Sequence, residues 1–479
     1  MACYNFEPRH IANLDFKRLF EEERRDSCFA FAFETDDSFY AARDHLGIVP
    51  LYFRIKDGGC YFSTCLCELL DSALKPSYKG YKWFIALGSP KIVPPFNDID
   101  VVPPGSVLKI DKQSLRKEVI YQYKFKPRDL RGLHGDLVVK ELDRLMVQAL
   151  ERTLKERRVG LYLSGGIDSA LVGAYLTGMG VDVNAYTLAP WGQISSEIPY
   201  SLMNAKRIGV KDHYIDELDL SMIAKYLEEI PCFYGTIPGV SSALGIVSLL
   251  KHTPLLTERQ VYFAQGADTI SCIMPVQNLV WVAGLLPRVV RKWLSANLGK
   301  EDVVLDYLAV ASEGLIDSYP NEWYRELISA VKGKIQKLSL AGMYLVHTPP
   351  DGDVLIDPLI KRHILVSNPF YDVDLIEFFL GLSVKYRLKF SLRQRTKVYL
   401  DKSLIKKLAS AYLDKEVLQR KKGLTVPIYL NDDLMRKLHE AKPLFNLKPK
   451  GSEQMFRVLV FQQYCLYHGI SIDSTCVSD

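Results

Sequence analysis

The 479-residue sequence lacks several features that mark common classes of protein. None of its nine cysteines forms a C-x-x-C pair and no histidine cluster accompanies them, which argues against a zinc site. An odd number of cysteines in a large chain favours reduced thiols in a cytoplasm. Residues 1–20 carry charged side chains where a signal peptide has its apolar core. The most apolar stretch, 279–290, contains Pro287 and is too short to span a bilayer. We therefore expect a soluble cytoplasmic protein without membrane contact.

The sequence also lacks a strong charge of either sign. It has 61 basic and 56 acidic residues, a net charge of +5, which argues against dedicated nucleic-acid binding. Its 48% hydrophobic and 24% charged residues are ordinary for a globular protein, and the length suggests two to three domains.

Two patterns divide the chain. Residues 27–110 are mainly short, aromatic-rich segments separated by Asp, Gly or Pro, which predicts β-strands. A charged linker follows, and residues 137–154 then show the apolar spacing of an amphipathic helix. From residue 159, strand-like and helix-like segments alternate, which predicts a doubly wound parallel sheet with helices on both faces. Beyond about residue 275 the pattern is mainly helical. We place the boundary between two domains at residues 125 and 126.

One short segment carries the clearest chemical signal. In VGLYLSGGIDSALV a buried strand runs into Ser164, Gly165 and Gly166, and a helix then begins. Glycines allow close approach of an anion to backbone N–H groups, and a helix N-terminus attracts negative charge. Ser164 and Ser169 add hydroxyl donors. Asp168 beside phosphates requires a cation, which predicts a Mg²⁺ ligand.

The lysine of a Walker A loop is absent here. Instead, S-G-G-x-D-S resembles the pyrophosphate loop of N-type ATP pyrophosphatases. This resemblance implies that ATP is split between its α and β phosphates, leaving AMP on a substrate carbonyl. A serine-capped helix after a glycine turn is the structural alternative.

Further motifs occur in one order along residues 27–465. They are RDHLGIVPLYF, FNDIDVVPPGSVLKI, LYLSGGIDSALV, SSEIPYSLMNAKRIGV, QGADT, NPFYDVDLIEFFLGL and QRKKGLTVP. Together they resemble asparagine synthetase and its amide-forming relatives, the β-lactam and carbapenam synthetases and the lasso-peptide cyclases. The resemblance implies a truncated glutaminase-like β-rich sandwich over residues 1–125. Residues 126–479 would form an ATP-pyrophosphatase domain with a helical extension.

The resemblance also implies roles for single residues. Asp268 would join Asp168 as a second Mg²⁺ ligand, since two carboxylates facing one triphosphate require a metal between them. Lys422, and with a weaker match Lys397, would be catalytic cations on the phosphate side. The remaining implied ATP contacts are Leu163, Ser164, Gly165, Gly166, Ser169, Leu188 and Gly266, with Leu163 and Leu188 against the adenine. The implied cofactors are ATP and Mg²⁺.

The sequence departs from this family at two places. The family's glutaminase uses an N-terminal cysteine, whereas here Met1-Ala2-Cys3 begins the chain and the other glutaminase signatures are missing. We therefore expect the front domain to be inactive. In QGADT, Gln265 and Thr269 stand where relatives carry other residues, and Asp401 stands where relatives often have arginine. These changes argue against ordinary asparagine synthesis.

Three hypotheses follow for function. The first is an ATP-dependent ligase that adenylates a small-molecule or peptide carboxylate and passes the acyl group to an amine without glutamine; such a ligase could act as a homo-oligomer. The same chemistry could close a lactam within one molecule. The second is a non-catalytic partner that binds a nucleotide or a peptide. The third is a conventional synthetase that lacks its front end, against which Gln265 and Thr269 argue.

Overall fold

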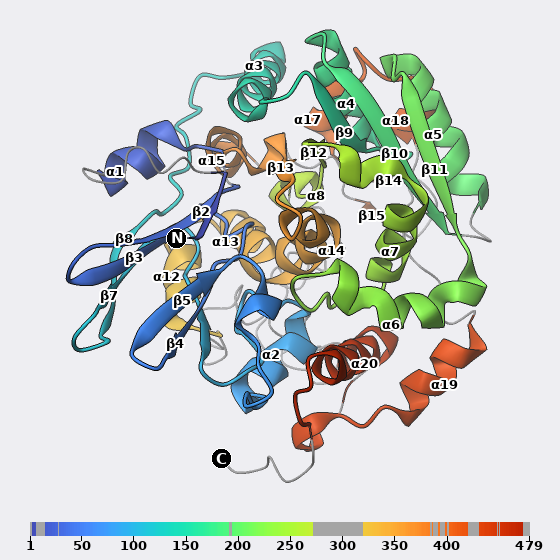
Figure 1. Ribbon diagram of the computed structural model, residues 1–479. Helices are drawn as coiled ribbons and strands as arrows, with labels where there is room; N and C mark the ends of the chain where they lie inside the picture. The colour runs from blue at the N-terminus through green and yellow to red at the C-terminus, as the bar shows by residue number, and fades with distance from the viewer. Residues whose placement is uncertain are drawn as a thin grey trace, which may run out of the picture.

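The computed structural model of the chain describes residues 2–5, 15–26, 28–190, 194–271, 320–383, 386, 391–392, 398–399, 402–419, 431–447, 449 and 451–472. Figure 1 shows antiparallel sheets on one side (blue) and a parallel sheet flanked by helices on the other (mainly green), with further helices between and below them. This mixed α/β architecture confirms the predicted fold class.

Two antiparallel sheets form the N-terminal part. Their strand orders are β1-β2-β3-β7-β8 and β5-β4-β6. The strands are β1 (Ala2–Tyr4), β2 (Ala30–Glu34), β3 (Ser38–Arg43), β4 (Tyr52–Lys56), β5 (Gly59–Ser63), β6 (Ile99–Val101), β7 (Ser106–Asp111) and β8 (Lys117–Gln122), and the helix α2 (Tyr78–Leu87) precedes β6. Aromatic rings pack between the sheets: the Phe39 and Phe62 ring centroids are 6.3 Å apart.

The RDHLG segment forms a tight turn after β3. The buried Arg43 guanidinium donates to the carbonyls of Gly47, Val49, Lys91 and Val102. Gly47 has φ +65°, and a Cβ there would lie 2.8 Å from the guanidinium carbon, so the motif requires glycine at this position. Arg43 therefore ties together three segments of the N-terminal part.

A five-stranded parallel sheet forms the second part, in the order β11-β10-β9-β12-β13. The strands are β9 (Arg158–Tyr162), β10 (Asp182–Pro190), β11 (Asp212–Leu218), β12 (Gln260–Tyr262) and β13 (Leu365–Ser367). The chain places β10 and β11 on one side of β9, then returns to place β12 on the other side. The ends of β9 and β12 thus flank the point where the strand order reverses, which is where ligands bind in open α/β sheets.

Helices cover both faces of this sheet. The helices α4 (Ile167–Gly178), α5 (Ile194–Ile208) and α7 (Ser242–His252) pack on its strands, whereas the main contacts of α3 (Asp136–Thr153), α6 (Ile223–Phe233) and α8 (Ala267–Ser271) are with other helices. A Cβ at Gly173 of α4 would lie 2.9 Å from the Leu161 side chain, and one at Gly245 of α7 would lie 2.4 Å from that of Leu188. Leu161 pairs with Ala185, three residues from Leu188 on the same strand, so the two leucines point to opposite faces.

The part after residue 319 is mainly helical where it is described, as predicted. Its helices are α12 (Glu322–Ser329), α13 (Lys334–Ala341), the π-helix η7 (Gly342–Val346), α14 (Thr348–Ile360), α15 (Val373–Gly381), α17 (Ser403–Ala409), α18 (Lys415–Gln419), α19 (Asp432–Glu440) and α20 (Gly451–Tyr467). The strands β14 (Ser391–Leu392) and β15 (Val398–Tyr399) pair with each other. β13 is a strand that the sequence pattern did not predict.

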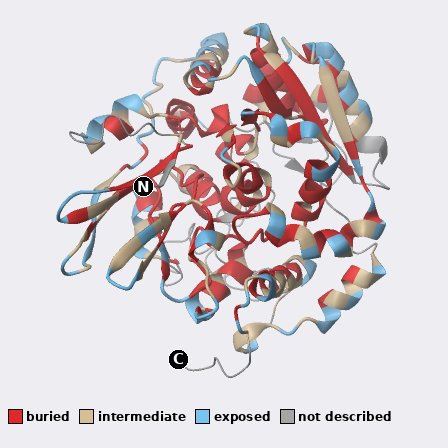
Figure 2. Cartoon of the chain, viewed as in Figure 1, coloured by how far each residue is buried: buried red, intermediate tan, exposed pale blue. Residues whose placement is uncertain are grey.

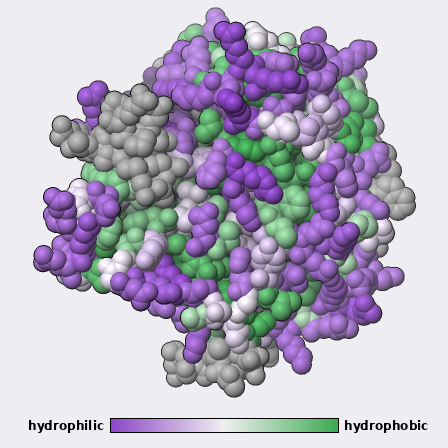
Figure 3. Space-filling view, in the orientation of Figure 1, coloured by the Kyte–Doolittle hydropathy of each residue, from purple (hydrophilic) through white to green (hydrophobic). Residues whose placement is uncertain are grey.

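The buried apolar residues of both parts form one continuous cluster, from Tyr4 to Ile470. Figure 2 shows this core running through the antiparallel sheets, the central helices and the parallel sheet. Hydrophilic side chains dominate the top of the face drawn in Figure 3. Among the described helices, none combines the length and the apolar composition that crossing a membrane requires. The boundary at residues 125 and 126 stays a prediction.

Candidate functional site

The loop after β9 is folded on its own hydroxyl groups. Ser169 Oγ accepts the Ser164 N–H at 3.0 Å and lies 3.0 Å from Ser164 Oγ. Ser164 Oγ accepts the Gly166 N–H at 3.1 Å, and α4 begins with the next residue. A Cβ at Gly166 would lie 3.0 Å from that hydroxyl, so glycine keeps the turn open. The predicted strand–loop–helix junction is therefore present, with both serines in the loop.

Two residues of α5 hold this loop from behind. Glu197 Oε2 accepts the Gly165 N–H at 2.8 Å, and Asn204 Nδ2 donates to the Ser164 carbonyl at 3.2 Å. Both side chains are buried, and Ser201 lies buried between them in sequence. These roles were not predicted from the sequence, although polar residues at positions i, i+4 and i+7 of one helix indicate a buried polar stripe.

The two predicted acidic residues meet at one cation. Asp168 is the second residue of α4 and Asp268 the second residue of α8. Lys402 Nζ forms ion pairs with Asp168 Oδ2 and with Asp268 Oδ1, the latter at 2.5 Å. The Lys402 and Asp168 side chains are 13% and 20% exposed, so this pair is largely buried, whereas Asp268 is 43% exposed and reaches the surface. The structure thus brings together carboxylates that lie 100 residues apart in the sequence.

These carboxylates fit a Mg²⁺ ion. Asp168 Oδ1 is buried and has no hydrogen-bond partner among the described residues, so it retains a lone pair for a ligand. The described residues contain no group of three or more His, Cys, Asp and Glu side chains placed to hold a metal. Two carboxylates with substrate phosphates and water are a typical Mg²⁺ environment, and a site of this kind needs no third protein ligand.

The lysine observed between the two carboxylates is Lys402. Lys397 and Lys422, together with Asp401, lie outside the described residues. Lys402, at the start of α17, was not predicted, because nothing local to the sequence distinguishes it from neighbouring surface lysines. Its contact with Asp168 spans 234 positions and depends on how α17 packs against α4.

Gly266 sets the path of the second acidic loop. Its φ is +94°, and a Cβ there would lie 2.7 Å from the Tyr371 ring, so only glycine fits. Tyr371 and Asn368 of the NPFYD motif hold the preceding residue: the Tyr371 hydroxyl donates to Gln265 Oε1 at 3.0 Å and Asn368 Nδ2 to the Gln265 carbonyl at 2.7 Å. These two motifs, distant in sequence, therefore form one unit.

The predicted adenine contacts occupy different surroundings. Leu163 is buried directly after β9, where its N–H donates to the Tyr186 carbonyl at 2.9 Å. Leu188 lies in β10 and packs against α7. Leu163 thus follows one strand and Leu188 lies in the neighbouring strand, while their contact with adenine stays a prediction.

A carboxyl group with a raised pKa lies in the helical turn next to the second acidic loop. Asp351, in the first turn of α14, has its pKa raised to about 6, mainly by burial, while the polar Gln265 side chain lowers this pKa. Glu453 and Asp353 raise this pKa further and Arg457 lowers it. Asp351 is thus a carboxylate with a pKa close to neutrality next to the QGADT loop, and it was not predicted.

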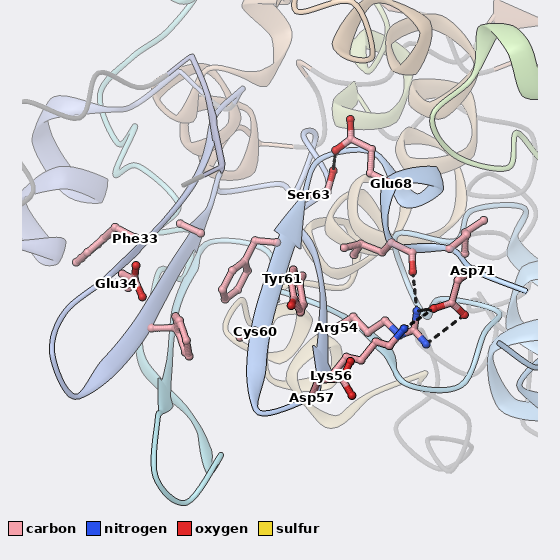
Figure 4. Close-up of a pocket in the computed structure, with 15 residues that line it drawn as sticks. Phe33, Glu34, Arg54, Lys56, Asp57, Cys60, Tyr61, Ser63, Glu68 and Asp71 are labelled. Atoms are coloured by element: carbon pink, nitrogen blue, oxygen red, sulfur yellow. Dashed lines mark hydrogen bonds and ion pairs between the residues drawn. The ribbon is translucent and has the colours of Figure 1, made fainter. Parts of the chain in front are cut away.

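A separate cavity of about 680 Å³ opens between β2 and β5 of the N-terminal part (Figure 4). Asp71 forms ion pairs there with Arg54 at 2.7 Å and Lys56 at 2.9 Å. Burial raises the pKa of the Cys60 thiol, which lines this cavity, to about 12. A thiol with so high a pKa is a poor nucleophile at neutral pH.

Cys3 takes part in β1 through its backbone, and the inactivity of a glutaminase-like domain here stays a prediction.

Residues 141–272 match the family model described as asparagine synthase. They extend from within α3 to just past α8 and so contain the loop at 164–166, Asp168 and Asp268. The chain is also 31% identical over 125 residues to the argininosuccinate synthase of Aquifex aeolicus (strain VF5). That match covers 25% of this chain and 28% of the relative, so the chain spans little more than a quarter of the relative's length. The family match supports a place for this region in the asparagine synthetase superfamily.

Proposed function

We propose that this protein is an ATP-dependent carbon–nitrogen ligase that adenylates a substrate carboxylate, releases pyrophosphate and transfers the acyl group to an amine. The observation that carries this proposal is the meeting of Asp168 and Asp268 at one cation, beside a glycine loop that opens a helix. The asparagine synthase match and the argininosuccinate synthase relative, whose names both denote synthases, agree with it.

The loop would bind the phosphates of ATP. The start of α4 supplies backbone N–H groups and a partial positive charge, while Glu197 and Asn204 keep the loop fixed before ATP arrives. Asp168 and Asp268 would hold Mg²⁺, which would neutralise charge on the phosphates. Lys402 would then leave the space between the carboxylates and pair with a phosphate oxygen. A cation at that place stabilises charge that builds on the leaving pyrophosphate.

Asp351 is the residue that we propose as the base for the amine. A general base works best when its pKa lies near the working pH, and burial places the pKa of Asp351 at about 6. The helical turn that carries Asp351 lies against Gln265, three residues before Asp268, since a Cβ on Gly352 would lie 3.9 Å from Gln265 Oε1. It would take a proton from the attacking nitrogen as the new amide bond forms and AMP leaves.

The finer assignments are also proposals. We favour an amine that comes from a second substrate or from the same molecule, since no feature of the N-terminal cavity suggests an activated cysteine among its lining residues. We place this reaction in specialised-metabolite or peptide biosynthesis in the cytoplasm. The closing of a lactam within one substrate uses the same residues.

The test is the nucleotide product formed when the purified protein meets ATP, Mg²⁺ and a metabolite extract of its source cells. We expect AMP and pyrophosphate that depend on the extract and disappear in Asp168→Ala. If calorimetry shows that ATP binds but no condition yields AMP, the protein is a nucleotide-binding partner and the ligase proposal is wrong.

A further inference from the structure

A buried ion pair joins the N-terminal part of the chain to α14, the helix that carries Asp351. Lys91 follows α2 and is 2% exposed, and its Nζ lies 2.9 Å from Asp353 Oδ1 of α14. Ser89 Oγ donates to the other oxygen, Asp353 Oδ2, at 2.5 Å. Both Asp353 oxygens therefore have partners from the N-terminal part, and burial raises the pKa of Asp353.

The Lys91–Asp353 pair lies close to Asp351, the residue that we propose as the base for the amine. Asp353 is two residues from Asp351 on the same helix. A Cβ built on Gly352, between them, would meet Lys91 Nζ at 3.4 Å and Gln265 Oε1 at 3.9 Å. The first turn of α14 is thus enclosed between the Lys91 ammonium and the loop that carries Gln265 and Asp268.

Lys91 is itself held in place. Its carbonyl accepts from Arg43 at 3.4 Å, and its Nζ also donates to the Ile48 carbonyl at 3.4 Å. The RDHLG segment therefore serves as the support of this lysine. Tyr344 of η7 adds another link, because its hydroxyl donates to the His45 carbonyl at 3.3 Å.

We propose that Lys91 is a positioning residue: it holds the first turn of α14 through Asp353 so that Asp351 faces the amine. The N-terminal part then contributes a wall of the acceptor pocket, which explains how this segment can serve a ligase without supplying ammonia. This inference rests on the proposed ligase function. It concerns the transfer step alone, because within the described part of the chain the side-chain partners of Lys91 are Asp353 and the Ile48 carbonyl, and neither belongs to the proposed phosphate site.

The experiment separates the two half-reactions. ATP–pyrophosphate exchange with the active extract fraction reports adenylation, and AMP release with the same fraction reports the full reaction. Added hydroxylamine reports trapping of the adenylate by a small nucleophile that is already neutral at pH 7 and needs no base. Lys91→Met is compared with the matched control Lys56→Met, an exposed lysine that pairs with Asp71 in the same part.

We expect Lys91→Met to reduce AMP release at least tenfold while exchange and hydroxylamine trapping stay within about twofold. Because an unpaired buried Asp353 would also destabilise the fold, Lys91→Met is repeated with Asp353→Asn, which removes both charges and keeps an acceptor for Ser89. The double variant should regain thermal stability without regaining AMP release.

Equal loss of all three activities, or recovery of AMP release together with stability in the double variant, would show a structural role and overturn the inference. Absence of exchange in the wild-type protein would instead overturn the proposed function. The two failures are therefore distinguishable.

Discussion

The Gly165 N–H donates to the Glu197 carboxylate at 2.8 Å, so an acidic side chain fastens the loop that we assign to phosphate binding. The carboxylate is 5% exposed and comes from α5, a helix beside the one that the loop opens. The loop is consequently in a fixed shape before ATP arrives, and this reduces the ordering that binding would otherwise require.

We expect Glu197→Ala to weaken Mg·ATP binding about tenfold, because a hydrogen bond to a charged group contributes roughly 1.5–3 kcal/mol and the loop loses it. Glu197→Gln keeps an acceptor for Gly165 and should stay within about threefold of the wild-type dissociation constant. Isothermal titration calorimetry measures both, with the exposed Glu217→Ala as control. Equal weakening in the Ala and Gln variants would contradict a role through this hydrogen bond.

Removal of the Lys402 ammonium should change how the melting temperature responds to Mg²⁺ in the absence of nucleotide. In Lys402→Met, Asp168 and Asp268 face each other without the ammonium, so their repulsion should lower the melting temperature by about 2 °C. Mg²⁺ alone at millimolar concentration should restore it, whereas the wild-type protein should not respond. Differential scanning fluorimetry with and without Mg²⁺ measures the effect. Lys407→Met, on the same helix but paired with the exposed Asp136, is the control and should show no response.

The parts of the site that the sequence predicted are local ones. The loop at 164–166 and Asp168 follow from a strand, a glycine pair and a helix that are consecutive in the chain. Asp268 and Gly266 were found through a short motif, and the positive φ of Gly266 gives that motif a physical reason. Alternation of strands and helices was enough to predict a parallel sheet, and the return of β12 to the other side of β9 explains why the two loops meet.

The parts that the sequence did not predict depend on tertiary packing. Lys402 and Asp168 are 234 positions apart in the sequence, and Ser89 and Asp353 are 264 positions apart. No local sequence pattern can therefore predict either contact. β13 has three residues, which is too short for a periodic signal, and it forms because β12 offers an open edge. Lys397 and Lys422 lie outside the described residues, and their roles stay predictions.

The proposed role of Asp351 as a base predicts that AMP release depends on pH. If it removes the proton of the amine, AMP release in the wild-type protein should fall as the pH drops through about 6, where this carboxylate takes up a proton. Asp351→Asn should lose at least 100-fold in AMP release, with ATP–pyrophosphate exchange nearly unchanged. The falling limb near pH 6 should also be absent from its residual activity. An acid limb that persists in the Asn variant would assign the proton transfer to another group.

Asp357 makes stability depend on pH. Burial, and then the charge of Asp353, raises the pKa of Asp357 to about 7, while Lys361 and the N–H groups of Gly235 and Thr236 lower it. The folded protein therefore keeps this proton up to about pH 7, whereas the unfolded chain loses it near the ordinary pKa of about 3.9. The resulting stabilisation is complete below that ordinary value and is lost as the pH rises through 7.

The melting temperature of the wild-type protein should accordingly fall between about pH 4 and about pH 7 and level off at higher pH, and Asp357→Asn should flatten this fall. Asparagine keeps an oxygen for the N–H groups of Gly235 and Thr236, which donate to Asp357 Oδ2 at 2.6 Å and 3.1 Å, and it carries no charge at any pH. Asp98→Asn is the control, because Asp98 is exposed and its φ of +61° also suits asparagine. If the Asp357→Asn protein still loses stability between about pH 4 and about pH 7 as the wild type does, another buried group must carry the titration.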